Sequence, residues 1–150
     1  MCSARKEEAM RKKLTLLLAL TAALVLLAGC KVSGKPLPEG MDATELITQG
    51  REVAAMLNRE EWQEVYDLLR EDARETTSPD AIRDYMEGLL DKAGAYVTES
   101  DIMTTGQKLK DTGEEYGTAV LYCKHEKKSM MYRIAYSTDM ELMGIEVKVQ

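Results

Sequence analysis

The 150-residue sequence contains no Phe, one Trp and one His. A single His excludes zinc hydrolase sites that require two histidine ligands. The formal net charge is −6. This excess of acidic over basic residues argues against a nucleic acid as partner, because affinity for phosphate backbones comes largely from clustered basic residues. The apolar fraction of 45% is ordinary for a folded chain. The composition therefore predicts one globular domain, and we expect no metal and no cofactor.

Residues 1–29 have the pattern of a signal peptide. Basic residues 11–13 precede an uncharged run of about 14 residues, which is short for a membrane span of roughly 20. The run ends in Leu27-Ala-Gly-Cys30, which resembles the lipobox of bacterial lipoproteins. That resemblance implies cleavage before Cys30 and a diacylglyceryl group on its sulfur. An uncleaved anchor helix is the alternative, and Met10, which precedes Arg-Lys-Lys, competes with Met1 as the start of the chain.

The predicted mature chain is acidic, with 15 basic and 24 acidic residues and a formal charge of −9. An anionic bilayer would repel it, so the acyl chains on Cys30 would hold it at the membrane. We expect a lipid-anchored protein on the extracytoplasmic face of the cell membrane, with a Gram-positive envelope favoured. Residues 30–41 include two Pro and two Gly and are predicted to form a flexible tether after the lipidated cysteine.

The remaining residues, 42–150, divide into a helical half and a strand half. Apolar residues recur at steps of three and four in three segments, which predicts three amphipathic helices. Ser78 and Pro79 are typical of a helix start, and Gly94 is typical of a helix end. The predicted helices run from Asp42 or Thr44 to Asn58, from Trp62 to Leu69 over about three turns, and from Ser78 to Gly94.

The second half of the domain alternates apolar and polar residues at the spacing of strands. The predicted strands lie within 97–109, 116–124, 130–137 and 143–149, and a charged hairpin loop at 125–129 places His125 in solvent. Cys123 is predicted to be a buried core residue, because no partner for a disulfide remains in the mature chain. The sequence predicts an α+β fold, with three N-terminal helices packed on a curved antiparallel sheet of about four strands.

Three segments of the domain carry a family resemblance: 57–69 around Trp62, 77–82 around Pro79, and 90–96 around Gly94. Together with the order of helices and strands, they resemble cone-shaped domains of the nuclear-transport-factor-two-like, or cystatin-like, superfamily. More narrowly, they resemble the bacterial domain of unknown function numbered 3887. The resemblance covers most of 44–150. It implies a cystatin-like cone with a pocket between sheet and helix, and it brings no catalytic residues to carry over.

Two function hypotheses from different classes remain open. The favoured one is a non-catalytic module of the cell envelope that binds a ligand or a protein, with a homodimer as an open alternative. Four tyrosines on inward-facing stripes are the predicted contributors to a pocket: Tyr66, Tyr85, Tyr132 and Tyr136. The rival is a small envelope isomerase or hydrolase that would use Asp101 with a tyrosine. No Gly-rich phosphate loop, nucleophile elbow or CxxC motif is present.

Overall fold

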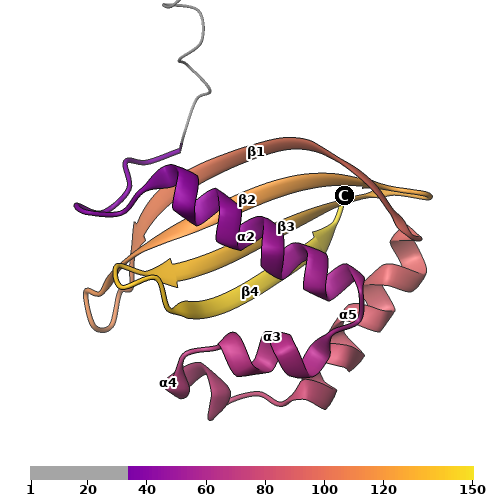
Figure 1. The fold of residues 1–150 in the computed structure, drawn as a ribbon, viewed down its shortest axis with the longest axis horizontal. Helices are drawn as coiled ribbons and strands as arrows, with labels where there is room; N and C mark the ends of the chain where they lie inside the picture. Colours follow the sequence, from indigo (N-terminus) through magenta and orange to yellow (C-terminus); the bar gives the residue numbers. More distant parts are fainter. Residues whose placement is uncertain (1–33) are drawn as a thin grey trace, which may run out of the picture. The chain divides into compact units, whose positions relative to one another are not determined.

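The computed structural model describes residues 34–150, which form an α+β domain (Figure 1). This fold class is as predicted, but the described residues contain four helices and not three. Their order places all helices before all strands. The elements are α2 (Ala43–Asn58), α3 (Trp62–Leu68), α4 (Glu71–Arg74), α5 (Pro79–Ala93), β1 (Tyr96–Lys108), β2 (Glu115–His125), β3 (Ser129–Ser137) and β4 (Leu142–Val149).

Local sequence signals set the ends of the two long helices. The Asp42 side chain accepts a hydrogen bond from the Glu45 amide at 2.8 Å and caps α2. Ser78 does the same for α5 through the Ala81 amide, with Pro79 in the first turn. Gly94 ends α5 with a φ of 78°, a conformation that favours glycine. The predicted bounds of both helices are confirmed to within a residue.

The second helix is shorter than the predicted three turns. It ends at Leu68, since Leu69 is extended and forms a parallel bridge with Leu142 of β4. The Arg70 amide donates to the Leu142 carbonyl at 2.8 Å. The single-turn helix α4 follows. Pairing with the sheet therefore ends the helix one residue before the predicted Leu69, which the apolar spacing alone could not predict.

The four strands form one antiparallel sheet in the order β1-β2-β3-β4, which confirms the predicted antiparallel sheet of about four strands. The even-numbered positions of β3 face the core. In β4, a register shift opposite Ala135 pairs Tyr136 with Leu142. Leu142 is consequently buried and Met143 is only partly buried, where strict alternation favours Met143. The inward residues of these two strands include Met130, Tyr132, Ile134, Tyr136, Leu142 and Val147.

The sheet bends around α2, which lies across one of its faces (Figure 1). Two register shifts in β1, between Tyr96 and Thr98 and between Glu99 and Asp101, contribute to this bend because bulges increase strand twist. Gly50 allows α2 to approach β2 closely, since a Cβ at this position would lie 2.7 Å from the Ala119 Cβ. The core between helix and sheet contains Cys123, which confirms its predicted burial.

The predicted flexible tether is wrong for the part of residues 30–41 that the structure describes. The Gly34 amide donates to the Thr104 carbonyl, and the Gly106 amide donates to the Lys35 carbonyl, each at 2.9 Å. Leu37 then packs against the core. These contacts cover one end of the β1 edge. The predicted signal peptide and Cys30 lie outside the described residues. None of the helices within 34–150 is long and apolar enough to span a membrane.

Candidate binding cavity

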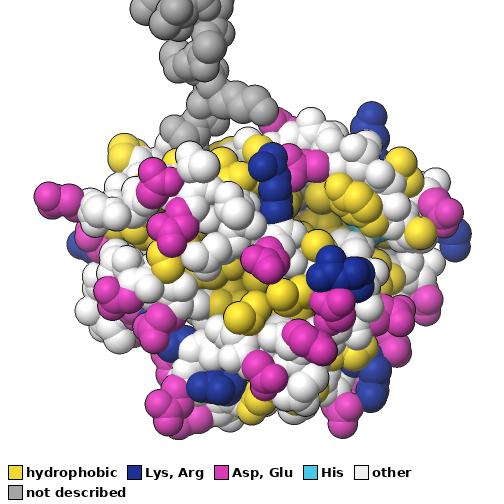
Figure 2. Space-filling view, viewed as in Figure 1, with side chains coloured by type: hydrophobic (Ala, Val, Ile, Leu, Met, Phe, Trp, Pro, Cys, Tyr) yellow, Lys and Arg dark blue, Asp and Glu magenta, His cyan; other side chains and the backbone are white. Residues whose placement is uncertain are grey.

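A cavity of about 710 Å³ lies between α2 and the neighbouring ends of β1 and β2. Figure 2 shows this side of the molecule, where hydrophobic surface is visible between scattered acidic and basic side chains. The volume falls in the range of small-molecule sites. The cavity is lined by Arg51, Ala54, Ala55, Asn58, Arg59, Ala95, Tyr96, Thr98, Glu99, Leu121 and Cys123.

Two elements bring these side chains together. Arg51, Ala55 and Asn58 are spaced by four and three residues on α2, so they form one stripe beside the apolar stripe that enters the core. Thr98 and Glu99 both line the cavity although they are neighbours on β1. A regular strand turns neighbouring side chains to opposite faces, so the register shifts in β1 explain this arrangement.

Each charged group of the cavity is paired with an opposite charge. Arg51 forms a bidentate pair with Glu99, with Nη2 to Oε1 at 2.7 Å and Nε to Oε2 at 2.9 Å. This hydrogen bonding to Glu99 raises the pKa of the Arg51 guanidinium. Arg59 pairs in the same way with Glu61 and lowers the pKa of that carboxyl. The cavity therefore presents little uncompensated charge to a ligand.

The floor of the cavity is apolar and chemically inert at neutral pH. Leu121 and Cys123 are each 2% exposed. Burial raises the pKa of the Cys123 thiol to about 11, so the thiolate needed for nucleophilic chemistry is scarce. Tyr96 stands at the entrance with 47% of its surface exposed. Neighbouring Val97 is also exposed. This entrance offers aromatic and aliphatic contact to an entering molecule.

A buried hydrogen-bonded chain lies next to the cavity. Asn58 Nδ2 donates to the Tyr132 hydroxyl at 3.1 Å, and that hydroxyl lies 3.0 Å from His125 Nε2. His125 Nδ1 lies 2.8 Å from the Gly94 carbonyl, so Nδ1 carries the proton and Nε2 accepts in the neutral ring. Burial raises the pKa of Tyr132. These hydrogen bonds connect α2, β2, β3 and the end of α5.

The predicted solvent position of His125 is wrong. The residue is the last of β2 and is 7% exposed. The charged neighbours that suggested a loop lie in the exposed turn 126–128. His125 instead faces inward, with its ring against Tyr132 and edge-on to Tyr96. Both ring nitrogens have hydrogen-bond partners, so the buried histidine is satisfied.

The four predicted pocket tyrosines do not meet in one cavity. Tyr132 is fully buried under the cavity, and Tyr136, 3% exposed, lies further along the same strand. Tyr66 is half-buried against the core. Tyr85 lines a second, smaller cavity beside β4. Asp101 is exposed on β1, and its carboxylate accepts from the Ile102 amide at 2.8 Å.

The sequence analysis missed the residues that shape the cavity, in particular Arg51, Tyr96 and Glu99. For Arg51 a signal exists, because it lies seven residues before Asn58 on the edge of the apolar stripe of α2. For Tyr96 and Glu99 none exists, because their orientation depends on bulges. Within residues 34–150, no group of three or more His, Cys, Asp or Glu side chains is placed to hold a metal ion.

Known proteins provide a family and a fold for this chain. A search of curated proteins finds no match. A solved structure described as "NMR structure of protein from Ruminococcus gnavus ATCC 29149" is similar, with a TM-score of 0.63 and 24% identity. The match covers 75% of this chain and 96% of that chain, and it supports the α+β fold alone. The family described as "Protein of unknown function (DUF3887)" matches residues 51–145. This chain therefore belongs to the DUF3887 family.

Proposed function

We propose that this protein is a lipid-anchored module on the extracytoplasmic face of a bacterial cell membrane. In this proposal the domain binds a small, largely uncharged ligand and does not transform it. The ligand occupies the cavity of about 710 Å³ between α2 and the ends of β1 and β2, here called the α2–β1 cavity. The observation that carries the binding role is the pairing of Arg51 with Glu99 above an apolar floor. Both charges are neutralised within the protein, so a neutral ligand enters without leaving an ion unpaired.

The fold supports the same role through its resemblance to a cystatin-like cone. In such a domain the bent sheet and its long helix enclose a pocket, and here α2 and β1 take those positions. The rival hypothesis of an envelope enzyme has weaker support. Asp101 does not line the cavity. Glu99, which does, has both carboxylate oxygens bonded to Arg51, so no free carboxylate of residues 34–150 faces the cavity as a general base.

The anchoring role depends on Cys30. Cys30→Ser removes the thiol that would accept the diacylglyceryl group, so we expect the precursor to remain uncut and unlipidated in the bacterium. Mass spectrometry of the mature N-terminus measures this directly. Cys2→Ser is the matched control and is expected to leave lipidation unchanged. Cleavage at another bond, or an unmodified Cys30, would exclude the lipoprotein proposal.

The binding role is tested by filling the cavity. We expect uncharged aromatic and aliphatic amides to bind the full chain in detergent micelles and to shift the amide resonances of Tyr96 and Leu121. Ala55→Leu places a larger side chain in the cavity and should weaken this binding at least tenfold. Ala43→Leu makes the same change at an exposed helix position and should leave amide binding unchanged. Conversion of any bound amide to a product would contradict a non-catalytic role.

A further inference from the structure

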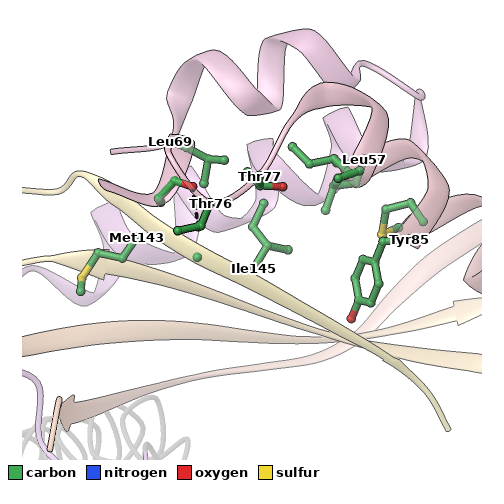
Figure 3. Close-up of a pocket in the computed structure, with 12 residues that line it drawn as sticks. Leu57, Leu69, Thr76, Thr77, Tyr85, Met143 and Ile145 are labelled. Carbon is green, nitrogen blue, oxygen red and sulfur yellow. Dashed lines mark hydrogen bonds between the residues drawn. The ribbon is translucent and has the colours of Figure 1, made fainter. Parts of the chain in front are cut away.

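A second cavity, of about 240 Å³, lies between the exposed edge of β4 and the segment that joins α4 to α5 (Figure 3). It is separate from the α2–β1 cavity and shares no lining residue with it. Among residues 34–150, no charged side chain lines it. The residues are Leu57, Leu69, Ala73, Thr76, Thr77, Ala81, Ile82, Tyr85, Met86, Met143, Gly144 and Ile145.

β4 is an edge strand, so one side of its backbone faces away from the sheet. Two neighbours satisfy parts of that side. At one end, the Arg70 amide donates to the Leu142 carbonyl. At the other end, the Tyr85 hydroxyl donates to the Val147 carbonyl at 2.7 Å and accepts from the Val147 amide at 3.1 Å. A single phenol thus takes the place that a residue of a fifth strand would occupy.

The backbone of Ile145 lies between these two covered positions. In a regular antiparallel ladder, residues two apart turn their N–H and C=O groups to the same side. The pairing is regular from Ile145 to Val147, so Ile145 turns both groups outward as Val147 does. Across residues 34–150, none of the hydrogen bonds made outside the helices and strands uses either group of Ile145. The edge of β4 therefore offers one hydrogen-bond donor, the Ile145 N–H, and one acceptor, the Ile145 C=O, to an added strand.

The backbone of a peptide residue complements both the N–H and the C=O of Ile145. In an antiparallel hydrogen-bonded pair, two opposite residues exchange both of their N–H···O bonds. Their side chains lie on the same face of the sheet. Ile145 points from β4 toward the segment that carries Thr76 and Thr77 (Figure 3). A residue paired with it would thus direct its own side chain into the cavity.

We propose that the β4-edge cavity binds one apolar residue of an extended peptide, which pairs with Ile145 through its backbone. The cavity is smaller than the 300–1,000 Å³ of drug-sized sites and suits a single side chain. The uncharged lining selects an apolar side chain over a charged one. Arg70 and Tyr85 close the edge on either side, so about three peptide residues fit between them.

The probe for this proposal is the tripeptide acetyl-Ala-Leu-Ala-amide, titrated into the ¹⁵N-labelled full chain in detergent micelles. We expect a downfield shift of the Ile145 amide resonance and shifts of the resonances of Thr77 and Ile82. The same peptide with an N-methyl group on its leucine keeps the side chain but loses the N–H. It should bind about tenfold more weakly or worse. Equal binding of both peptides would overturn the backbone pairing.

Two protein variants separate this site from the α2–β1 cavity. Ala81→Leu fills the β4-edge cavity from an exposed position on α5 and should abolish peptide binding. Ala55→Leu should leave peptide binding unchanged. The peptide test does not depend on the proposed function, because its result stands even if no amide binds the α2–β1 cavity. Two outcomes would overturn the proposal. One is no response of Ile145 to the peptide. The other is a shift of Ile145 that follows protein concentration without peptide, which would assign the edge to a second copy of the chain.

Discussion

The hydroxyl of Tyr132 lies 3.0 Å from Nε2 of His125 in the interior of the domain, and Asn58 completes the contact from α2. Each of the three groups is buried or half-buried. If one of them is removed, the other two lose a hydrogen-bond partner that water does not replace. Neither side chain of the Tyr132–His125 pair reaches the cavity lining. Their arrangement thus stabilises the fold beside the candidate cavity and is not part of its lining.

Tyr132→Phe removes this hydroxyl while the ring remains. We expect a loss of about 1–3 kcal/mol in the free energy of unfolding, because His125 and Asn58 lose a buried hydrogen-bond partner. Urea denaturation of a fragment of residues 34–150 measures the change. Tyr122→Phe is the matched control, since the Tyr122 side chain makes no hydrogen bond within residues 34–150. Equal stability of the two variants would contradict the structural role of the Tyr132 hydroxyl.

Two helical glycines should respond in opposite directions to the same substitution. Gly50→Ala places a Cβ at 2.7 Å from the Ala119 Cβ, so α2 must move away from the sheet. We expect a loss of about 1–3 kcal/mol. A Cβ at Gly88 on α5 meets no atom within 4 Å, so Gly88→Ala should add about 0.5–1 kcal/mol through helix propensity. Thermal unfolding distinguishes the two, and stabilisation by Gly50→Ala would show that α2 is not in close contact with β2.

The sequence predicts those features of the fold that depend on local chemistry. Ser78, Pro79 and Gly94 mark the ends of α5 because capping and left-handed backbone conformations require particular residues. Tertiary pairing is different. Leu69 is extended and forms a bridge with Leu142 of β4, and no local signal records that contact. The helical spacing of Leu69 consequently predicts a longer α3 than the structure contains.

The candidate cavity is harder to predict than the fold because its shape follows from irregularities. The register shifts in β1 bring Tyr96 and Glu99 to one cavity, and strict alternation does not predict a shift. His125 shows a related limit. Its neighbours in sequence are charged, so composition favours a loop, but its own position in the β2 ladder opposite Tyr96 turns it inward. Burial at a strand end depends on pairing that short-range sequence does not reveal.

Alkaline pH should destabilise the domain partly through Cys123. Burial raises the pKa of its thiol from 9.0 to about 11, so between these values the unfolded chain loses a proton that the folded chain retains. The contribution of the Cys123 thiol to the free energy of unfolding is fully present below pH 9. It falls by about 2–3 kcal/mol as the pH rises to 11. Burial also raises the pKa values of Tyr132 and Tyr136, which adds to the loss above pH 10.

The contribution of the thiol is separated by the variant Cys123→Ala, which has no group to titrate at this position. Urea denaturation at pH 8, 9 and 10.5 gives the slope of stability against pH for both proteins. Cys123→Ala is less stable at pH 8 because it loses packing atoms, but its slope between pH 9 and 10.5 should be shallower. Parallel slopes would show that the thiolate forms as readily in the folded chain as in the unfolded chain.

Residues 34–41 should contribute to the stability of the domain, although their Pro and Gly content suggests a linker. A fragment 42–150 lacks the hydrogen bonds of Gly34 to Thr104 and of Gly106 to Lys35, and it lacks Leu37. We expect it to be less stable than fragment 34–150 by about 1–3 kcal/mol, because two backbone bonds and part of an apolar side chain are lost. The Gly106 amide provides a local measurement, since its hydrogen exchange should be slow in the longer fragment and fast in the shorter one. Lys35→Ala keeps the backbone bonds and should leave both quantities unchanged. If the two fragments unfold at the same urea concentration and their Gly106 amides exchange at the same rate, the segment is a free tether after all.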